Sequence, residues 1–306
     1  MRYKLSAPAT LHTTIQLPAS KSISNRALIL HALAQGHIAP SNLSDCDDTR
    51  VMIKALDGNP GHIDILAAGT AMRFLTAYLS VTPGTRIITG TERMQQRPIR
   101  ILVDALRELG AQIEYAGKEG FPPLRITGTE LTGEEISLAG NVSSQYISAL
   151  LMIGPILKNG LRLNLTGEII SRPYINLTLQ LMKEFGADAA WSSESSITVR
   201  PGKYRDIPFT VESDWSGASY WYQMVALIQD NEKKESTKTE IKLPGLLPHS
   251  YQGDSRGAEI FAKLGVHTTY TDQGVVLTKM GTPVTCLKED LVDIPDLAQT
   301  FVVTCC

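Results

Sequence analysis

Pro-Ala-Ser-Lys-Ser-Ile-Ser-Asn-Arg-Ala-Leu-Ile-Leu occupies residues 18–30 and joins two different hydrophobic patterns. Before it, residues 13–17 alternate polar residues with Ile15 and Leu17, a pattern typical of a β-strand. After it, residues 27–33 are almost entirely apolar and predict a buried helix. The sequence therefore predicts a strand, a turn rich in hydroxyl groups, and the N-terminus of a helix.

Such a helix start is a favourable place for an anion. Its first backbone N–H groups have no partner within the helix, and the helix dipole places partial positive charge there. Lys21 and Arg26 add two cations, so we expect the turn to bind phosphate or carboxylate. For a single turn, an ordinary serine N-cap with two solvated cations fits equally well. The recurrence of the pattern along the chain favours the anion site.

Four more polar segments precede apolar runs in the same way; they occupy residues 68–73, 142–146, 214–219 and 294–297. A second pattern alternates with the first. Three amphipathic segments each end at a glycine, namely Gly110, Gly186 and Gly265, and each is followed by a predicted strand, turn and strand. Glycine at this position is typical of a helix C-cap. Nearly equal spacing of the three glycines indicates a repeated αβ subdomain.

We therefore expect an α/β protein built of repeated βαβαββ units. The first unit is shortened, and the last has barely begun when the sequence reaches Cys306, which predicts a fragment of a longer parent. Counting repeats predicts a complete three-unit domain at 20–212. Residues 1–19 would join 213–306 in an incomplete second domain.

Composition narrows the class of protein. The 306 residues carry 29 cations and 31 anions, a net charge of −2 that argues against a nucleic-acid partner. No apolar run reaches the length of a membrane span, so no membrane partner is expected. The four cysteines show neither paired spacing nor histidine partners, which predicts no metal site, no disulfide framework and a cytoplasmic setting; they are Cys46, Cys286, Cys305 and Cys306.

Two Arg-Pro dipeptides follow predicted strands at equivalent positions. Arg97-Pro98 and the segment Ser171-Arg172-Pro173-Tyr174 each place a cation just before or at a helix start. One such dipeptide is commonly structural, but the repetition favours a function. Among carboxylates at helix starts, an N-cap role is favoured for Asp214. For Asp296, an N-cap and a functional role are equally consistent with the sequence.

Five segments together resemble one enzyme family, the 5-enolpyruvylshikimate-3-phosphate (EPSP) synthases. The resemblance covers essentially the whole chain. It rests on Pro-x-Ser-Lys-Ser-x-Ser-Asn-Arg at 18–26, Ala-Gly-Thr-Ala-Met-Arg at 68–73, Arg-Pro-Ile at 97–99, Ser-Ser-Gln at 143–145 and Ser-Arg-Pro-Tyr at 171–174. It implies the enolpyruvyl-transferase fold, in which βαβαββ units form two inside-out α/β domains with the active site between them.

The resemblance also implies a reaction: transfer of the enolpyruvyl group of phosphoenolpyruvate to the 5-hydroxyl of shikimate-3-phosphate, without a metal or organic cofactor. Asp296 would accept the hydroxyl proton, with Lys21 as the second catalytic residue. Phosphoenolpyruvate would contact Lys21, Gly69, Arg97 and Gln145. Shikimate-3-phosphate would contact Ser22, Arg26, Ser143, Ser144, Gln145, Ser171, Tyr174 and Asp296. A monomer is expected.

The chain departs from the family pattern at Ala67, where asparagine is common, and at Phe74, where proline is common. Both positions adjoin the expected phosphoenolpyruvate site and bear on inhibitor sensitivity. The family's later Lys-Glu and Arg motifs would follow residue 306.

Two alternatives remain at this stage. The sister transferase that acts on UDP-N-acetylglucosamine carries a reactive cysteine in a loop that corresponds to 91–97, where this chain has none. A catalytically silent fragment that binds shikimate-3-phosphate is the other.

Overall fold

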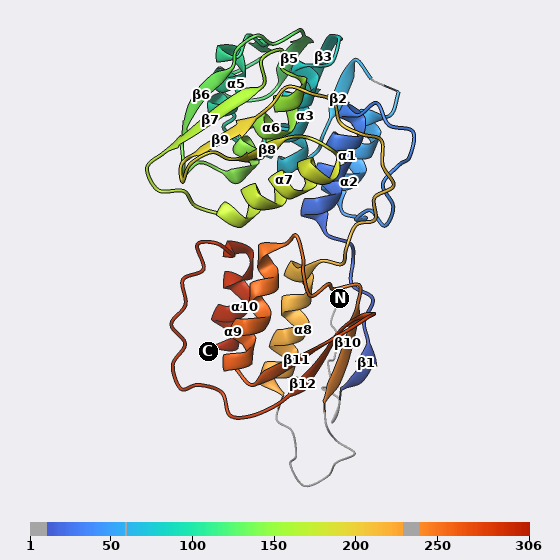
Figure 1. Cartoon of the computed structure of the whole chain (residues 1–306), viewed down its shortest axis with the longest axis vertical. Helices are drawn as coiled ribbons and strands as arrows, with labels where there is room; N and C mark the ends of the chain where they lie inside the picture. Colours follow the sequence, from blue (N-terminus) through green and yellow to red (C-terminus); the bar gives the residue numbers. More distant parts are fainter. Residues whose placement is uncertain (1–10, 59, 229–238) are drawn as a thin grey trace. The chain divides into compact units, whose positions relative to one another are not determined.

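The computed structural model describes residues 11–58, 60–228 and 239–306. The chain divides into two compact units between Ala19 and Ser20 and between Val211 and Glu212 (Figure 1). One unit is the continuous segment Ser20–Val211. The other combines the chain before Ser20 with Glu212–Cys306.

The unit Ser20–Val211 contains two four-stranded sheets of the same topology. Each sheet pairs two strands in parallel and adds an antiparallel hairpin, in the orders β2-β3-β5-β4 and β6-β7-β9-β8. The first sheet comprises β2 (His62–Asp64), β3 (Gly84–Thr89), β4 (Gln112–Tyr115) and β5 (Leu124–Gly128). The second comprises β6 (Glu135–Ala139), β7 (Leu161–Thr166), β8 (Ala189–Trp191) and β9 (Ser196–Val199).

Three helices form the centre of this unit. They are α1 (Lys21–Leu33), α3 (Gly69–Ser80) and α6 (Ser144–Ile153), and α3 packs against both of the others. Nearly every residue of α3 and α6 is buried, as expected for helices that are apolar on all sides. The remaining helices of the unit are α2 (Asp47–Leu56), α4 (Glu92–Gln95), α5 (Arg100–Glu108), η1 (Gly154–Ile156) and α7 (Arg172–Glu184).

The helices end just before the glycines that the sequence predicts as C-cap residues. Helices α5 and α7 are followed by Gly110 and Gly186, whose φ angles of 105° and 89° lie in the left-handed region. A residue with a Cβ adopts this region at a cost, so glycine is favoured there. Each glycine turns the chain into the antiparallel hairpin of the adjoining sheet.

The second unit has one four-stranded sheet, in the order β1-β10-β12-β11, and helices on it. Its strands are β1 (His12–Thr14), β10 (Glu240–Pro244), β11 (Val266–Thr271) and β12 (Gly274–Lys279). Its helices are α8 (Trp215–Leu227), η3 (Gly253–Arg256), α9 (Gly257–Lys263), η4 (Pro295–Leu297) and α10 (Ala298–Thr304). A row of contacting aromatic rings runs through the core, formed by Trp215, Tyr222, Phe261 and Phe301.

The first predicted strand is shorter than expected. It ends at Thr14 instead of residue 17, although Ile15 N still donates to Lys242 O at 2.9 Å. Ile15 and Leu17 pack against the core of this unit. The alternation of polar and apolar residues therefore reflects side-chain burial that continues beyond the last paired residue of β1.

The α/β class predicted from the sequence is confirmed. Among the described residues, no helix has the length and apolar character needed to cross a membrane. The count of three repeats in the first domain stays a prediction. Ser41, between α1 and α2 in the sequence, forms an isolated parallel bridge with Thr210.

Candidate active site

Two predicted helix starts lie side by side in the unit Ser20–Val211. Gln145, in the first turn of α6, donates from Nε2 to Thr70 Oγ1 in the first turn of α3 at 3.4 Å. Asp48 of α2 accepts a hydrogen bond from Thr70 N at 3.1 Å. The N-cap residue of α3 is Ala68, whose side chain makes no capping hydrogen bond. The positive end of α3 is therefore held in place by neighbouring helices.

Gly69 lies against two guanidinium groups. A Cβ at this position would lie 2.5 Å from Arg97 Nη1 and 3.0 Å from Arg73 Nη1. Arg73 Nη1 also donates to Gly69 O at 2.8 Å. Glycine is thus required for the close approach of these cations to the start of α3 rather than for an unusual φ angle. Two arginines and a helix N-terminus meet at one place.

The two arginines differ in their surroundings. Arg97 is exposed, whereas Arg73 is buried and stacks on the Tyr146 ring at 5.8 Å. Burial lowers the pKa of Arg73, interaction with Tyr146 raises it, and the positive charge of Arg97 lowers it further. Such like charges repel, and an anion between them would relieve that repulsion. The Tyr146 hydroxyl donates to Pro98 O at 2.9 Å and so ties the segment after Arg97 to α6.

The start of α1 has the predicted serine cap. Ser20 Oγ accepts from Ile23 N at 3.5 Å, and Lys21 and Ser22 follow in the first turn. Lys21 is exposed and Ser22 is partly buried. Arg26, in contrast, is 3% exposed, and burial lowers its pKa to about 10.

Arg26 makes four hydrogen bonds inside the unit. Its acceptors are Thr178 Oγ1 at 2.7 Å, Ser22 O at 2.9 Å, Ser148 Oγ at 3.0 Å and Tyr174 O at 3.5 Å. Because a guanidinium carries five N–H donors, at most one remains for a ligand. Arg26 therefore joins α1 to α6 and α7, and Phe74 packs on it with the guanidinium 5.3 Å from the ring centre.

Ser171 and Tyr174 mark the start of α7. Ser171 has φ 54° and ψ 35°, a left-handed conformation, and its side chain makes no capping hydrogen bond. A serine in this region stores backbone strain, which is often found at ligand sites. Tyr174 O accepts from Thr178 Oγ1 at 2.9 Å as well as from Arg26.

At the start of α6, Ser143 is the N-cap residue and its Oγ accepts from Gln145 N at 3.4 Å. Ser143 is exposed, and Ser144 and Gln145 are partly exposed. The structure therefore brings together Gly69, Arg97 and Gln145 around α3, and Ser22, Arg26 and Tyr174 around α1 and α7.

The second unit holds the predicted carboxylates. Asp214 caps α8, accepting from Gly217 N at 2.9 Å, which confirms the N-cap interpretation. Asp296 is exposed, lies inside η4, and is not the cap residue of η4 or α10. The sequence interpretation did not include Asp254, which is 4% exposed and accepts from Ser216 Oγ. Burial raises the Asp254 pKa to about 6, the Ser216 hydrogen bond opposes this, and Asp296 and Asp214 raise it further.

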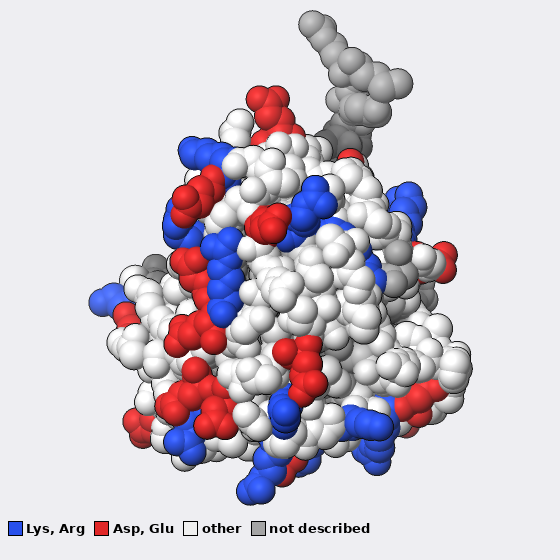
Figure 2. All heavy atoms as spheres, turned by 90° about the horizontal axis from the view of Figure 1, so that it is seen from above, with Lys and Arg blue, Asp and Glu red and all other residues white. Residues whose placement is uncertain are grey.

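Other residues near the site also have no defined role in the sequence prediction. In the sequence, Arg73 is only the last residue of the polar segment 68–73, and Asp48 and Tyr146 were not selected. Their positions depend on contacts between helices far apart in the sequence. On the face drawn in Figure 2, acidic and basic side chains are interspersed, and most of the visible surface belongs to uncharged residues.

Comparison with known proteins agrees with these features. The model of the family described as EPSP synthase (3-phosphoshikimate 1-carboxyvinyltransferase) matches residues 5–58 and 59–306. A 3-phosphoshikimate 1-carboxyvinyltransferase of Bacteroides fragilis is 72% identical over 305 residues, which cover 100% of this chain and 72% of that protein. The enzyme of that name from Shewanella pealeana is 37% identical over 319 residues, covering 95% of this chain and 72% of its own length.

The fold agrees as well. A solved EPSP synthase from Acinetobacter baumannii superposes with a TM-score of 0.76 at 20% identity, covering 95% of this chain and 70% of that one. This similarity concerns the fold, and the sequence relatives identify the family. The chain belongs to the EPSP synthase family.

Proposed function

We propose that this chain transfers the enolpyruvyl group of phosphoenolpyruvate to the 5-hydroxyl of shikimate-3-phosphate and releases phosphate. In this reaction the hydroxyl oxygen adds to C2 of phosphoenolpyruvate while C3 gains a proton. The resulting tetrahedral species loses phosphate from C2 and a proton from C3 to give the enol ether. The transfer is a step of aromatic amino-acid biosynthesis. Its main support in the structure is the concentration of positive charge where Arg73 and Arg97 meet the start of α3.

That concentration suits the phosphate and carboxylate of phosphoenolpyruvate. Arg97 is exposed and can form a bidentate contact, while Gly69 lets backbone N–H groups approach the anion. Gln145 adds a side-chain amide next to the same helix start. Lys21 supplies a flexible cation from α1. Cations fixed before the substrate arrives stabilise charge that develops in the transition state without further reorganisation.

Shikimate-3-phosphate has a phosphate, a carboxylate and hydroxyl groups, which suit the hydroxyl-rich starts of α1, α6 and α7. We assign its recognition to Ser22, Ser143, Ser144, Ser171 and Tyr174, with Gln145 at the boundary of the two substrates. Arg26 has one N–H at most for the ligand and otherwise fixes Ser22 and Tyr174 through their carbonyl oxygens. Its contribution to shikimate-3-phosphate binding therefore includes positioning.

Asp296 is the proposed proton acceptor for the 5-hydroxyl. Asp296 is exposed within η4, and the N-cap residues of η4 and α10 are Ile294 and Leu297. Asp254 lies close enough to be affected by its charge. Proton acceptance by a placed carboxylate typically contributes about 10²–10⁴ in rate.

The reaction can be tested by incubating the chain with both substrates and following phosphate release together with the enol ether by ³¹P NMR. Phosphate release that requires both substrates supports the proposal. Binding of shikimate-3-phosphate without any phosphate release supports the silent fragment instead.

A sharper test of the anion site uses Gly69→Ala. The new Cβ would force Arg97 to move, so we expect the KM for phosphoenolpyruvate to rise by about tenfold or more while the KM for shikimate-3-phosphate stays within about threefold. Gly61→Ala is the matched control, because a Cβ there meets no atom within 4 Å. Equal effects on the two substrates would contradict the assignment of this site to phosphoenolpyruvate.

We also propose that the chain acts as a monomer in the cytoplasm. The four cysteines are free thiols in the structure, which suits a reducing compartment. Light scattering at micromolar concentration, with substrates present, tests the monomer.

A further inference from the structure

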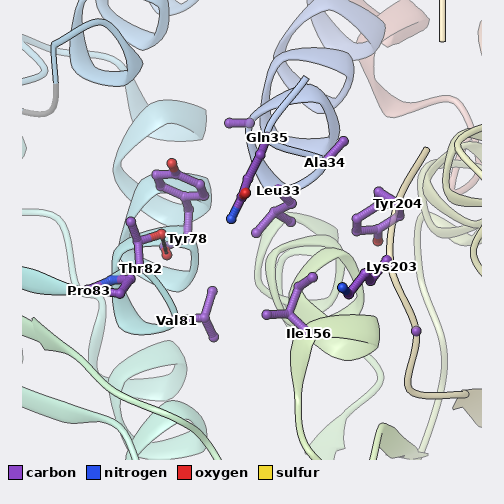
Figure 3. Close-up of a pocket in the computed structure, with 12 residues that line it drawn as sticks. Leu33, Ala34, Gln35, Tyr78, Val81, Thr82, Pro83, Ile156, Lys203 and Tyr204 are labelled. Carbon is purple, nitrogen blue, oxygen red and sulfur yellow. Dashed lines mark hydrogen bonds between the residues drawn. The ribbon is translucent and has the colours of Figure 1, made fainter. Parts of the chain in front are cut away.

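The three central helices α1, α3 and α6 also end together. The last turn of α1, the end of α3 and η1, which continues α6, surround a cavity of about 520 Å³ within the unit Ser20–Val211 (Figure 3). Gly202, Lys203 and Tyr204 close one side. The cavity lies at the ends of these helices opposite to the N-termini that form the candidate active site. None of the roles assigned above involves it.

Partial negative charge gathers at this end. The C-terminus of each helix carries roughly half an elementary negative charge, spread over its last carbonyl groups. Some of these groups are satisfied, for example Pro155 O, which accepts from Gly202 N at 2.8 Å. Leu33, Val81 and Ile156 are residues that line the cavity, and among the described residues no protein hydrogen bond reaches their carbonyl oxygens. This end of the cavity therefore favours a cationic group with N–H donors.

Lys203, which lines the same cavity, carries a positive charge. Figure 3 shows the amino group of Lys203 and the amide of Gln35 extending into the space between the helix ends. Both residues are exposed and can follow a ligand. Lys203 can pair with a carboxylate, and Gln35 can donate a second hydrogen bond to it.

The remaining wall is apolar. Leu33, Val81 and Ile156 present aliphatic side chains, and the rings of Tyr78 and Tyr204 flank them (Figure 3). The volume lies in the usual range of small-molecule sites, about 300–1,000 Å³. A ligand of this shape has an apolar body that removes the aliphatic wall from water.

We propose that this cavity binds an α-amino acid with an apolar or aromatic side chain. The ammonium group would contact the free carbonyl oxygens at the helix ends, the carboxylate would contact Lys203, and the side chain would lie against Leu33, Val81 and Ile156. A plain anion would meet the negative helix ends, and a plain amine would meet Lys203. A zwitterion satisfies both charges.

The experiment is calorimetric titration of the whole 306-residue chain with L-phenylalanine. We expect a dissociation constant of about 1 mM or lower, from the gain usual for a ligand of this size. Three analogues each lack one recognised feature: 3-phenylpropanoate has no ammonium group, phenethylamine has no carboxylate, and glycine has no apolar side chain. Each should bind at least about fivefold more weakly. Equal affinity for L-phenylalanine and 3-phenylpropanoate, or no binding of L-phenylalanine, would overturn the proposal.

Variants locate the site. Lys203→Met keeps the aliphatic stem and removes the charge, so it should weaken binding of L-phenylalanine by about fivefold. Lys54→Met, at an exposed position of α2, is the matched control and should leave binding unchanged. Lys21→Met separates this cavity from the proposed substrate site. Binding that is lost in Lys21→Met and kept in Lys203→Met would place the amino acid at the start of α1 and contradict the inference. Turnover of the unmodified chain is measured separately, so failure of the cavity proposal leaves the test of the transfer reaction intact.

Discussion

At the residue scale, Arg97 shows how a tertiary contact turns a dipeptide into a candidate ligand. An Arg-Pro dipeptide taken alone is commonly structural, yet the Arg97 guanidinium lies against Gly69 and near Arg73. The buried guanidinium of Arg73 keeps α3 and Tyr146 in place, while the exposed one of Arg97 is available to substrate. Arg73 thus supports the site, and Arg97 is placed to contact the substrate.

We predict that Arg97→Ala raises the KM for phosphoenolpyruvate by roughly ten- to a hundredfold, the effect of losing one charge-assisted bidentate contact. Affinity for shikimate-3-phosphate, measured by titration in the absence of phosphoenolpyruvate, should change by less than about threefold. Arg100→Ala is a suitable control, since Arg100 is exposed and pairs with Glu119. A similar loss of affinity for both substrates would mean that Arg97 supports the site as a whole.

Asp296 allows a test of proton transfer. Asp296→Asn keeps the shape of the side chain but removes its basicity, so we predict a fall in kcat of about 10²–10⁴. Binding of shikimate-3-phosphate should stay within about tenfold. Kinetics and thermal unfolding are measured on the same preparation. If turnover survives and only the melting temperature falls, the carboxylate has a structural role and the catalytic assignment is wrong.

At the element scale, the sequence predicts helix ends better than strand pairing. The polar starts of α1, α3, α6 and α8 and the glycines after α5, α7 and α9 follow from local chemistry, because caps and left-handed turns depend on a few adjacent residues. Strand β1 was predicted too long, since its length is set by pairing with β10, more than two hundred residues later. The family resemblance placed Gly69 and Arg97 at one site, but their direct contact depends on tertiary packing and has no local signal.

Asp254 is the clearest residue that the sequence could not reveal. It lies in the short helix η3, without a local motif, and its surroundings come from α8 and η4. Burial there raises the pKa of Asp254 from 3.8 to about 6. Between these two pH values the carboxyl group is protonated in the folded state and ionised in the unfolded state. Folding stability from this group is therefore present below about pH 4 and is lost as pH rises through 6, by up to about 3 kcal/mol.

We predict that Asp254→Asn removes this pH dependence. The difference in melting temperature, variant minus unmodified chain, should increase steadily from pH 4 to pH 6.5, because the asparagine never ionises. Taking the difference cancels the contribution of other carboxylates. Asp272→Asn, at an exposed turn between β11 and β12, is the control and should give a flat difference. A flat difference for Asp254→Asn as well would show that its pKa is not raised by burial.

At the scale of the whole molecule, the order of elements in the chain suggests which part is autonomous. The unit Ser20–Val211 is continuous in sequence and contains two complete four-stranded sheets around three central helices. The other unit combines sequence from both sides of it, as β1 pairs with β10. The size and continuous sequence of the unit Ser20–Val211 suit a domain that folds alone.

We predict that residues 20–211, produced alone, fold cooperatively. Near-ultraviolet and far-ultraviolet circular dichroism should report a single coincident thermal transition, the behaviour of a two-state domain. Residues 20–150 are the matched control: this shorter piece ends inside α6, and it keeps β6 but removes its parallel partner β7 and the whole of β8 and β9. It should lack a near-ultraviolet signal and bind a hydrophobic dye. If residues 20–211 also show helical signal without near-ultraviolet structure, their core requires the second unit, and the division between Val211 and Glu212 is not a boundary of folding.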